Sequence, residues 1–191
     1  MASVTFITHP DVAIDPHVSV PDWHLNPTGV ARMHAMLTQP WVASITHVAS
    51  STERKARDGA DILAAHLGLL PSVHADLGEN DRSATGYLPK LAFEALADAF
   101  FANPSQSMQG WERAVDAQTR IVGAMRAVLA STPPGDIAVV SHGGVGALLL
   151  CYLRKIPISR AADQPPGNGG YFLVFDRATW QLQSGWARID P

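Results

Sequence analysis

Two histidines follow apolar runs of the kind that form buried strands. Val4-Thr5-Phe6-Ile7 leads into Thr8-His9-Pro10, and a later apolar run leads into Ser141-His142-Gly143-Gly144. A neutral imidazole held at the end of a strand can act as a nucleophile or can bind an anion. Each histidine can equally be an ordinary turn residue. The predicted elements around them show which of the two interpretations is favoured.

The glycines after His142 favour an anion site at this point of the chain. Gly143 and Gly144 allow the backbone to approach a ligand closely. The free N–H groups and positive dipole of a helix that starts here attract groups such as phosphate. A tight turn without a ligand is the plainer alternative. A nucleotide-binding glycine loop fits less well, because the segment lies late in the chain and His142 takes its first small-residue position.

A third candidate is Arg54, which follows the apolar run 45–49 and begins a helical pattern. A cation in the first turn of a helix opposes the helix dipole unless an anion lies between them. Lys55 lies about 100° further around that helix, which predicts that it points elsewhere. If the strands are neighbours, Arg54 converges with His9 and His142.

The elements that would position these residues alternate along the chain. Asn26-Pro27 is a typical helix start, and Gly68 is a typical helix end. The expected strands are 4–8, 45–49, 73–76, 136–141, 171–175 and 181–187, and the expected helices begin near Asn26 or span 56–67, 89–101, 107–130 and 143–153. This alternation predicts a three-layer α/β/α sandwich with a mostly parallel sheet, whose active site lies at the carboxyl ends of the strands.

Composition limits the class of protein. A chain of 191 residues with 47% hydrophobic content is expected to form a single domain, 1–191, with a small cap-like insertion around 77–108. The net charge of −3 suggests neither a nucleic-acid partner nor an anionic membrane surface. The only cysteine, Cys151, lies in an apolar run and is expected to be buried and inert. Because the sequence shows no signal peptide or membrane span, a cytoplasmic location is expected.

Four motifs in this order resemble those of the histidine phosphatase superfamily, the phosphoglycerate-mutase-like enzymes. The family has an Arg-His-Gly, a Ser-x-x-x-Arg, a Leu-x-Glu and a late Ser-His-Gly-Gly. The corresponding segments here are Thr8-His9-Pro10, Ser50-Ser51-Thr52-Glu53-Arg54, Leu77-Gly78-Glu79 and Ser141-His142-Gly143-Gly144. The last segment is the most specific match, and the first keeps only the histidine.

The resemblance implies a phosphoric monoester hydrolase that needs no metal or other cofactor and acts on a small phosphorylated molecule. It implies that His9 is the nucleophile, that His142 is a catalytic residue, and that Glu79 is the general acid and then the base. It also implies that Arg54, His142 and Gly143 bind phosphate. From the residues alone, Asp81 rivals Glu79 as proton donor. A metal site built from His9-x-Asp11 with His142 is a further alternative, although no His-x-His supports it.

The departures from the family pattern bear on activity. Thr8 stands where the family has an arginine of the phosphate site, and Pro10 removes an N–H. The protein is therefore expected to be slow, to prefer an unusual phosphoester, or to be a catalytically silent protein that binds a phospholigand. A replacement cation is expected, and Arg82 is favoured over Lys55 and Arg57. Substrate specificity is expected to reside in residues 11–25 and 80–107. The sequence identifies neither the substrate nor the oligomeric state.

Overall fold

A computed structural model describes residues 2–190. Its strands are β1 (Ser3–Thr8), β2 (Ile45–Ser50), β3 (Ser72–Val73), β4 (Asp136–Ser141), β5 (Tyr171–Asp176) and β6 (Leu182–Arg188). Its α-helices are α1 (Pro27–Met36), α2 (Arg54–Leu67), α3 (Lys90–Ala102), α4 (Ala114–Ser131) and α5 (Gly143–Arg154). Four 3-10 turns join them, namely η1 (Val20–Asp22), η2 (Pro40–Ser44), η3 (Ala75–Leu77) and η4 (Arg160–Ala162).

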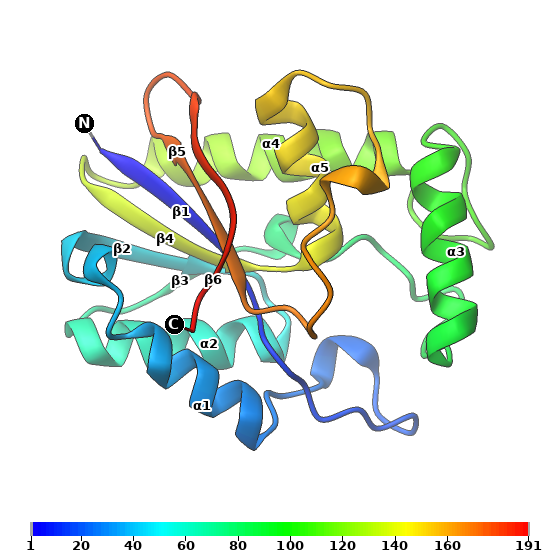
Figure 1. Cartoon of the computed structure of the whole chain (residues 1–191), viewed down its shortest axis with the longest axis horizontal. Coiled ribbons are helices and arrows are strands. Elements are labelled where there is room, and N and C mark those ends of the chain that lie inside the picture. Colours follow the sequence, from blue (N-terminus) through cyan, green and yellow to red (C-terminus); the bar gives the residue numbers. More distant parts are fainter. Residues whose placement is uncertain (1, 191) are drawn as a thin grey trace.

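The six strands form one sheet in the order β3-β2-β4-β1-β5-β6. β3, β2, β4 and β1 run parallel, whereas β5 and β6 are antiparallel additions at one edge. α1 and α2 cover one face of the sheet, and α4 and α5 cover the other, as Figure 1 shows. The predicted α/β/α sandwich with a mostly parallel sheet is therefore confirmed.

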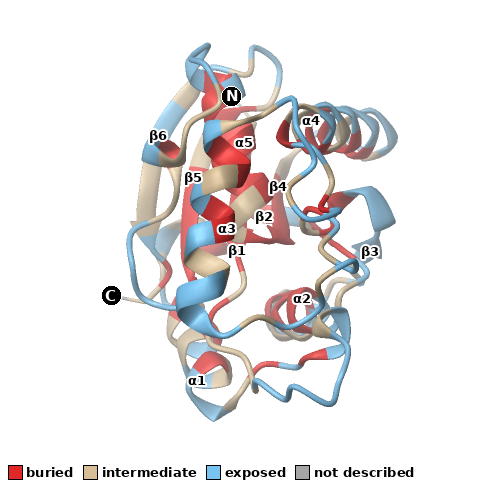
Figure 2. Ribbon diagram, turned by 90° about the vertical axis from the view of Figure 1, so that its right-hand side faces the viewer, coloured by how far each residue is buried: buried red, intermediate tan, exposed pale blue. Residues whose placement is uncertain are grey.

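Strand alternation divides the core into two layers. Phe6 packs with Ile121, Met125 and Leu149 on the α4/α5 side, and the next residue of β1, Ile7, packs in the layer on the α1/α2 side. Successive strand side chains point to opposite faces, so a strand buried on both sides must be apolar throughout. Figure 2 shows the buried residues gathered in the sheet and on the inner faces of the helices.

A third cluster lies under α3. Phe100 and Phe101 of α3 pack with Trp111 and with Leu148 of α5. α3 stands apart from the sheet, beyond the end at which β1 and β4 finish (Figure 1). Trp111 is 2% exposed and lies three residues before the start of α4.

The predicted start of α1 and the predicted end of α2 agree with the structure. The Asn26 side chain accepts a hydrogen bond from Gly29 N at 2.9 Å, and Gly68 ends α2 in the left-handed conformation. Cys151 is buried, as predicted. Two expected elements were wrong: the strand 73–76 is only Ser72–Val73, and the helix expected from 107 starts at Ala114. Segment 107–113 instead turns Trp111 into the cluster under α3.

No helix within residues 2–190 combines the length and the apolar character that a membrane crossing requires.

Candidate active site

The candidate site lies at the carboxyl ends of three neighbouring strands. Thr8 at the end of β1 pairs with Ser141 at the end of β4, and Ser50 at the end of β2 pairs with Val140. His9 and His142 leave these ends together, and their ring centroids lie 5.2 Å apart in an edge-to-face arrangement. The sequence-based expectation that the two histidines meet is confirmed.

A backbone carbonyl fixes the protonation state of His9. Its Nδ1 lies 2.9 Å from the carbonyl oxygen of Pro10, which can only accept a hydrogen bond. Nδ1 therefore carries the proton, and Nε2 keeps a lone pair. Burial, followed by the charge of Lys55, lowers the pKa of His9 to about 4. The ring is thus neutral near pH 7, in the form that a nucleophile needs.

His142 is completely buried, and only one of its two ring nitrogens has a hydrogen-bond partner within the described residues. Its Nε2 lies 2.7 Å from Ser51 Oγ and 3.3 Å from Glu53 Oε1. Burial and then the neighbouring His9 lower its pKa well below the usual value, so it is also neutral. Its Nδ1 has no hydrogen-bond partner within the described chain, and neither has Asn80 Nδ2 nearby. Leaving buried polar atoms unpaired costs about 1–3 kcal/mol each, and a ligand that contacts them would recover this energy.

Glu79 binds the start of α5. Its Oε2 accepts from Gly144 N at 3.1 Å and its Oε1 accepts from Val145 N at 2.9 Å. Burial raises the pKa of Glu79, but the charge of Arg82 and the hydrogen bond from Gly144 N–H outweigh it, so the pKa is lowered overall. Glu79 is therefore a carboxylate. Gly143 N, which donates no hydrogen bond within residues 2–190, remains for a ligand.

The cation that reaches the site from α2 is Lys55 and not Arg54. The Arg54 side chain is 62% exposed and donates to Asp58 at 2.7 Å. Lys55 is 3% exposed, and its Nζ lies 2.5 Å from Glu53 Oε2 and 2.9 Å from the carbonyl oxygen of Val20. The expectation that Lys55 points elsewhere was therefore wrong.

The helix face explains why Lys55 turns inward. Lys55 lies four residues before Gly59 and eight before Leu63, and all three belong to the buried face of α2. Arg54 instead has Asp58 four residues later, which gives an ion pair on the exposed side. This spacing is the signal in the sequence that could have identified Lys55.

Arg82 lies over two aromatic rings, and its role as the replacement cation stays a prediction. Its guanidinium carbon lies 5.0 Å from the ring centroid of Phe93 and 5.6 Å from that of Trp111. Its charge also acts on Glu79 and on His142. Asp81, by contrast, is exposed and accepts from Ser83 N at 2.8 Å within its own loop, which holds its pKa low.

Thr8 is buried and acts through a residue that the motifs did not indicate. Its hydroxyl donates to Gln164 Oε1 at 2.6 Å. Gln164 Nε2 lies so close to Gly143 that a Cβ there would be 2.5 Å from it. A neutral amide therefore lies beside the start of α5.

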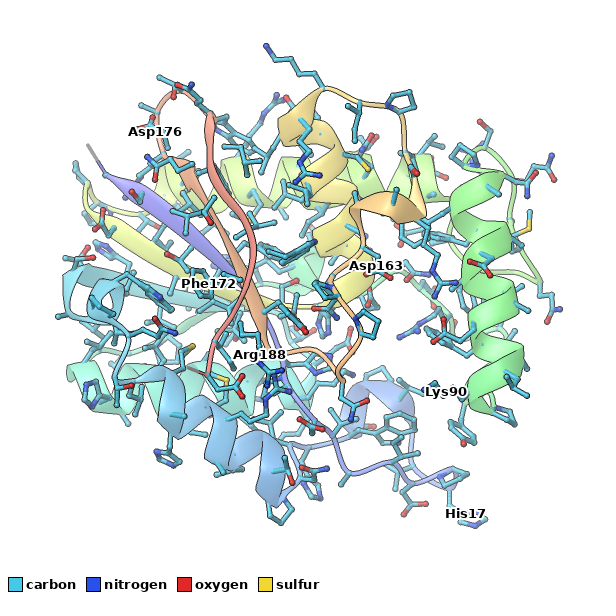
Figure 3. All side chains as sticks on the ribbon, in the orientation of Figure 1. His17, Lys90, Asp163, Phe172, Asp176 and Arg188 are labelled. Carbon is cyan, nitrogen blue, oxygen red and sulfur yellow. The ribbon has the colours of Figure 1, made fainter. Side chains whose placement is uncertain are left out.

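Asp163, the neighbour of Gln164, is also a residue that the sequence did not single out. It belongs to the segment between α5 and β5, on the side that faces α3 (Figure 3). Burial, and to a smaller degree the charge of Glu79, raise the pKa of Asp163 to about 6. Asp163 and Gln164 lie in a loop rich in proline and glycine, where no spacing pattern marks a functional residue.

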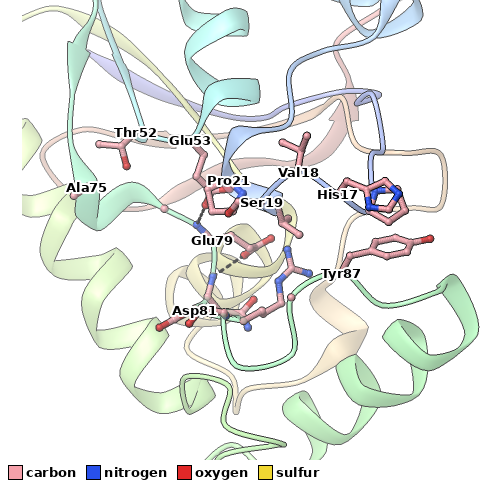
Figure 4. A pocket seen from close by; sticks show the side chains of 17 residues that line it. His17, Val18, Ser19, Pro21, Thr52, Glu53, Ala75, Glu79, Asp81 and Tyr87 are labelled. Atoms are coloured by element: carbon pink, nitrogen blue, oxygen red, sulfur yellow. Dashed lines mark hydrogen bonds between the residues drawn. The ribbon is translucent and has the colours of Figure 1, made fainter.

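Two cavities meet at these residues. One of about 640 Å³ is lined by His9, Glu79, Arg82, Asp163 and Gln164, among others. A second, of about 530 Å³, shares Glu79, Asn80 and Arg82 with the first. Figure 4 shows the second cavity, with Glu53 and Glu79 on one wall and His17 and Tyr87 on another.

Within residues 2–190, no group of three or more His, Cys, Asp or Glu side chains is arranged to hold a metal ion. Asp11, the partner that the metal alternative required, instead forms an ion pair with Arg32 at 2.8 Å.

Comparison with known proteins assigns the family. The model of the histidine phosphatase superfamily (branch 1) matches residues 14–185. The chain belongs to this superfamily. No curated protein gives a significant match.

Solved structures show the same fold at low identity. A mycobacterial glucosyl-3-phosphoglycerate phosphatase in complex with inorganic phosphate has a TM-score of 0.79 at 21% identity, covering 99% of both chains. YhfR of Bacillus stearothermophilus has a TM-score of 0.77 at 15% identity, covering 100% of this chain and 98% of that one. A putative alpha-ribazole-5'-P phosphatase from Escherichia coli has a TM-score of 0.71 at 18% identity, with the same coverage.

Proposed function

We propose that the chain is a metal-independent phosphatase that hydrolyses a phosphoester through a phosphohistidine on His9. The observation that carries the proposal is the state of His9, whose Nδ1 is held by the Pro10 carbonyl while Nε2 keeps its lone pair beside His142. Family membership supports it, as do phosphatases among the proteins of similar fold.

The first step forms a bond from His9 Nε2 to phosphorus. The bond from phosphorus to the leaving oxygen breaks, and the oxygen keeps that electron pair. Lys55 and Arg82 supply positive charge, while His142, Gly143 N and the Gln164 amide supply hydrogen bonds to the phosphoryl oxygens. Such preorganised groups act most strongly as charge moves in the transition state.

Glu79 handles the protons of both steps. A phosphoryl anion beside this carboxylate opposes its ionisation and raises its pKa, so Glu79 can take up a proton and pass it to the leaving oxygen. Glu79 then accepts a proton from the water that attacks the phosphohistidine. The bond from phosphorus to Nε2 breaks, and the electron pair returns to His9.

A silent phospholigand-binding protein of the same fold is the second candidate. It is favoured by the missing arginine at position 8 and by the Glu79 carboxylate that occupies two amides of α5. Retention of a neutral, oriented His9 favours the enzyme, because binding alone requires no nucleophile.

Rapid-quench experiments with a ³²P-labelled phosphoester distinguish the two, stopped with an alkaline denaturant because phosphohistidine is labile in acid. The wild-type protein should accumulate a covalent phosphohistidine, with turnover unaffected by EDTA. His9→Ala should form no adduct and lose at least about 10³-fold in kcat, as expected when a nucleophile is removed. His34→Ala, an exposed histidine of α1, is the matched control and should behave as wild type. Binding of phosphate without any adduct or turnover would support the silent protein, and metal-dependent turnover would contradict the mechanism.

A further inference from the structure

The charges around the two histidines do not suit a dianion. Three cations act on this cluster, namely Lys55, Arg82 and Arg160, together with four carboxylates, namely Glu53, Glu79, Glu94 and Asp163. When all are ionised, the carboxylates outnumber the cations by one. His9 and His142 add no positive charge, since burial keeps both rings neutral.

The charged groups further out along the larger cavity are already paired. Arg160 bonds to Glu94 and to Asp98. Arg32 lies between Asp11 and Asp190 at 2.8 and 3.0 Å. These two arginines therefore carry no surplus positive charge toward a ligand, and of the cations that line the cavity only the exposed Lys90 remains, at its rim.

The start of α5 also has fewer free backbone N–H groups for a ligand than a helix start usually has. Its positive end attracts negative charge, but the Glu79 carboxylate already takes the amides of Gly144 and Val145. The remaining donors, Gly143 N and the Gln164 amide, are neutral, and so is the His142 ring. Neutral donors can satisfy a singly charged group, whereas a second buried charge without a counter-ion is costly.

Two cavities leave room for two substituents on one phosphorus. Both border Glu79, Asn80 and Arg82, so they meet at the reaction centre. Each has an apolar side chain exposed at its wall: Ile14 is 61% exposed in the larger cavity, and Val18 is 40% exposed in the smaller. Two organic groups on the phosphorus, one in each cavity, would each find an apolar wall to contact.

We infer that the site acts on phosphoryl groups that carry a single negative charge, either a phosphodiester or a phosphomonoester in its singly protonated form. This inference rests on the proposed phosphoester hydrolysis and narrows its substrate class. With a diester, His9 Nε2 displaces one ester oxygen, and water then releases a monoester and frees His9.

Two aryl substrates test this inference, because p-nitrophenolate leaves without protonation. We would measure kcat/KM for bis(p-nitrophenyl) phosphate and p-nitrophenyl phosphate from pH 5 to 8.5. A monoester loses its second proton near pH 6, and p-nitrophenyl phosphate loses it at a lower pH because its nitrophenyl group withdraws electrons. Its kcat/KM should therefore fall about tenfold per pH unit above pH 6. Hydrolysis of the diester, a monoanion throughout, should change far less. Turnover of the diester across the range identifies a diesterase, and monoester turnover confined to low pH identifies the protonated monoester as substrate.

The opposite profile overturns the inference but not the hydrolase: His9-dependent monoester turnover that holds steady or rises from pH 6 to 8 and exceeds that of the diester. No His9-dependent turnover of either ester at any pH would overturn the proposed function itself, and this inference with it.

A charge variant gives an independent check. Asp163→Asn removes one negative charge of the cluster and should raise monoester kcat/KM at pH 8 about tenfold relative to that of the diester. Asp61→Asn on the exposed side of α2 is the matched control and should leave the ratio unchanged. An unchanged ratio in Asp163→Asn would overturn the charge argument.

Discussion

At the scale of single residues, the choice between Arg54 and Lys55 decides which cation serves the site. Both follow β2 and both lie within reach of a Ser-x-x-x-cation pattern, counted from Ser50 or from Ser51. Charge and motif spacing cannot separate neighbours in a sequence, but the helix rotation that buries Lys55 with Gly59 and Leu63 can. Position in a motif therefore needs to be checked against the buried face of the element.

We predict that Lys55→Met lowers kcat by about 10²–10³-fold, the usual cost of losing one donor to the transition-state charge. Because the charge of Lys55 contributes to lowering the pKa of His9, the same variant should raise that pKa above about 4. An NMR titration of the His9 ring measures the shift. Arg54→Ala, whose side chain is exposed beside Asp58, should leave both kcat and the His9 pKa unchanged. Equal losses in the two variants would contradict the assignment to Lys55.

At the scale of elements, the start of α5 was predicted as an anion site, and the first anion it binds is the protein's own Glu79. The sequence indicated the helix start and its glycines. It could not indicate that a carboxylate 65 residues earlier would reach Gly144, because that contact depends on how η3 and the following loop return across the end of β4. Gly144 is required here because a Cβ would lie 2.7 Å from Glu79 Oε1.

We predict that Gly144→Ala displaces Glu79 and lowers the free energy of unfolding by about 1 kcal/mol or more, the usual cost of a lost helix cap. Gly123→Ala in α4 is the matched control, since a Cβ at this exposed helical position meets nothing within 4 Å. It should stabilise the protein by about 0.5–1 kcal/mol. Chemical denaturation measures both. A Gly144→Ala protein as stable as Gly123→Ala would show that the cap contributes nothing.

At the scale of the whole molecule, the three layers of the sandwich were predictable from the sequence. The contact between the site and the loop that joins α5 to β5 was not. Hydrophobic periodicity predicted which segments form the central sheet. Because the carboxyl ends of parallel strands lie at one edge of a sheet, it also predicted that His9 and His142 lie close together. Gln164 reaches Thr8 across 156 residues, and no periodicity marks the loop that carries it. The contact of Gln164 with Thr8 was therefore visible only once the chain was folded.

The folded site also determines how stability varies with pH. Burial holds His9 neutral, with a folded pKa of about 4 against 6.5 when unfolded, so its contribution is present above pH 6.5 and is lost as the pH falls toward 4. The pH dependence of the stability contributed by Asp163 has the opposite sign. Its pKa is raised from 3.8 to about 6, so its contribution is present below pH 3.8 and is lost as the pH rises through 6.

We therefore predict that Asp163→Asn stabilises the protein at pH 7–8 and has no effect near pH 4. Above pH 6 the wild-type chain must hold a charged Asp163 in the cluster, which the amide avoids. Since the Asp163 side chain is 32% exposed, solvent screening limits the gain to at most about 2 kcal/mol. Thermal unfolding at both pH values measures it. The same substitution is expected to favour dianionic substrates, so stability and substrate preference should change together. A gain that is equal at pH 4 and pH 8 would mean that the side chain acts by packing and that its charge has no part in the effect.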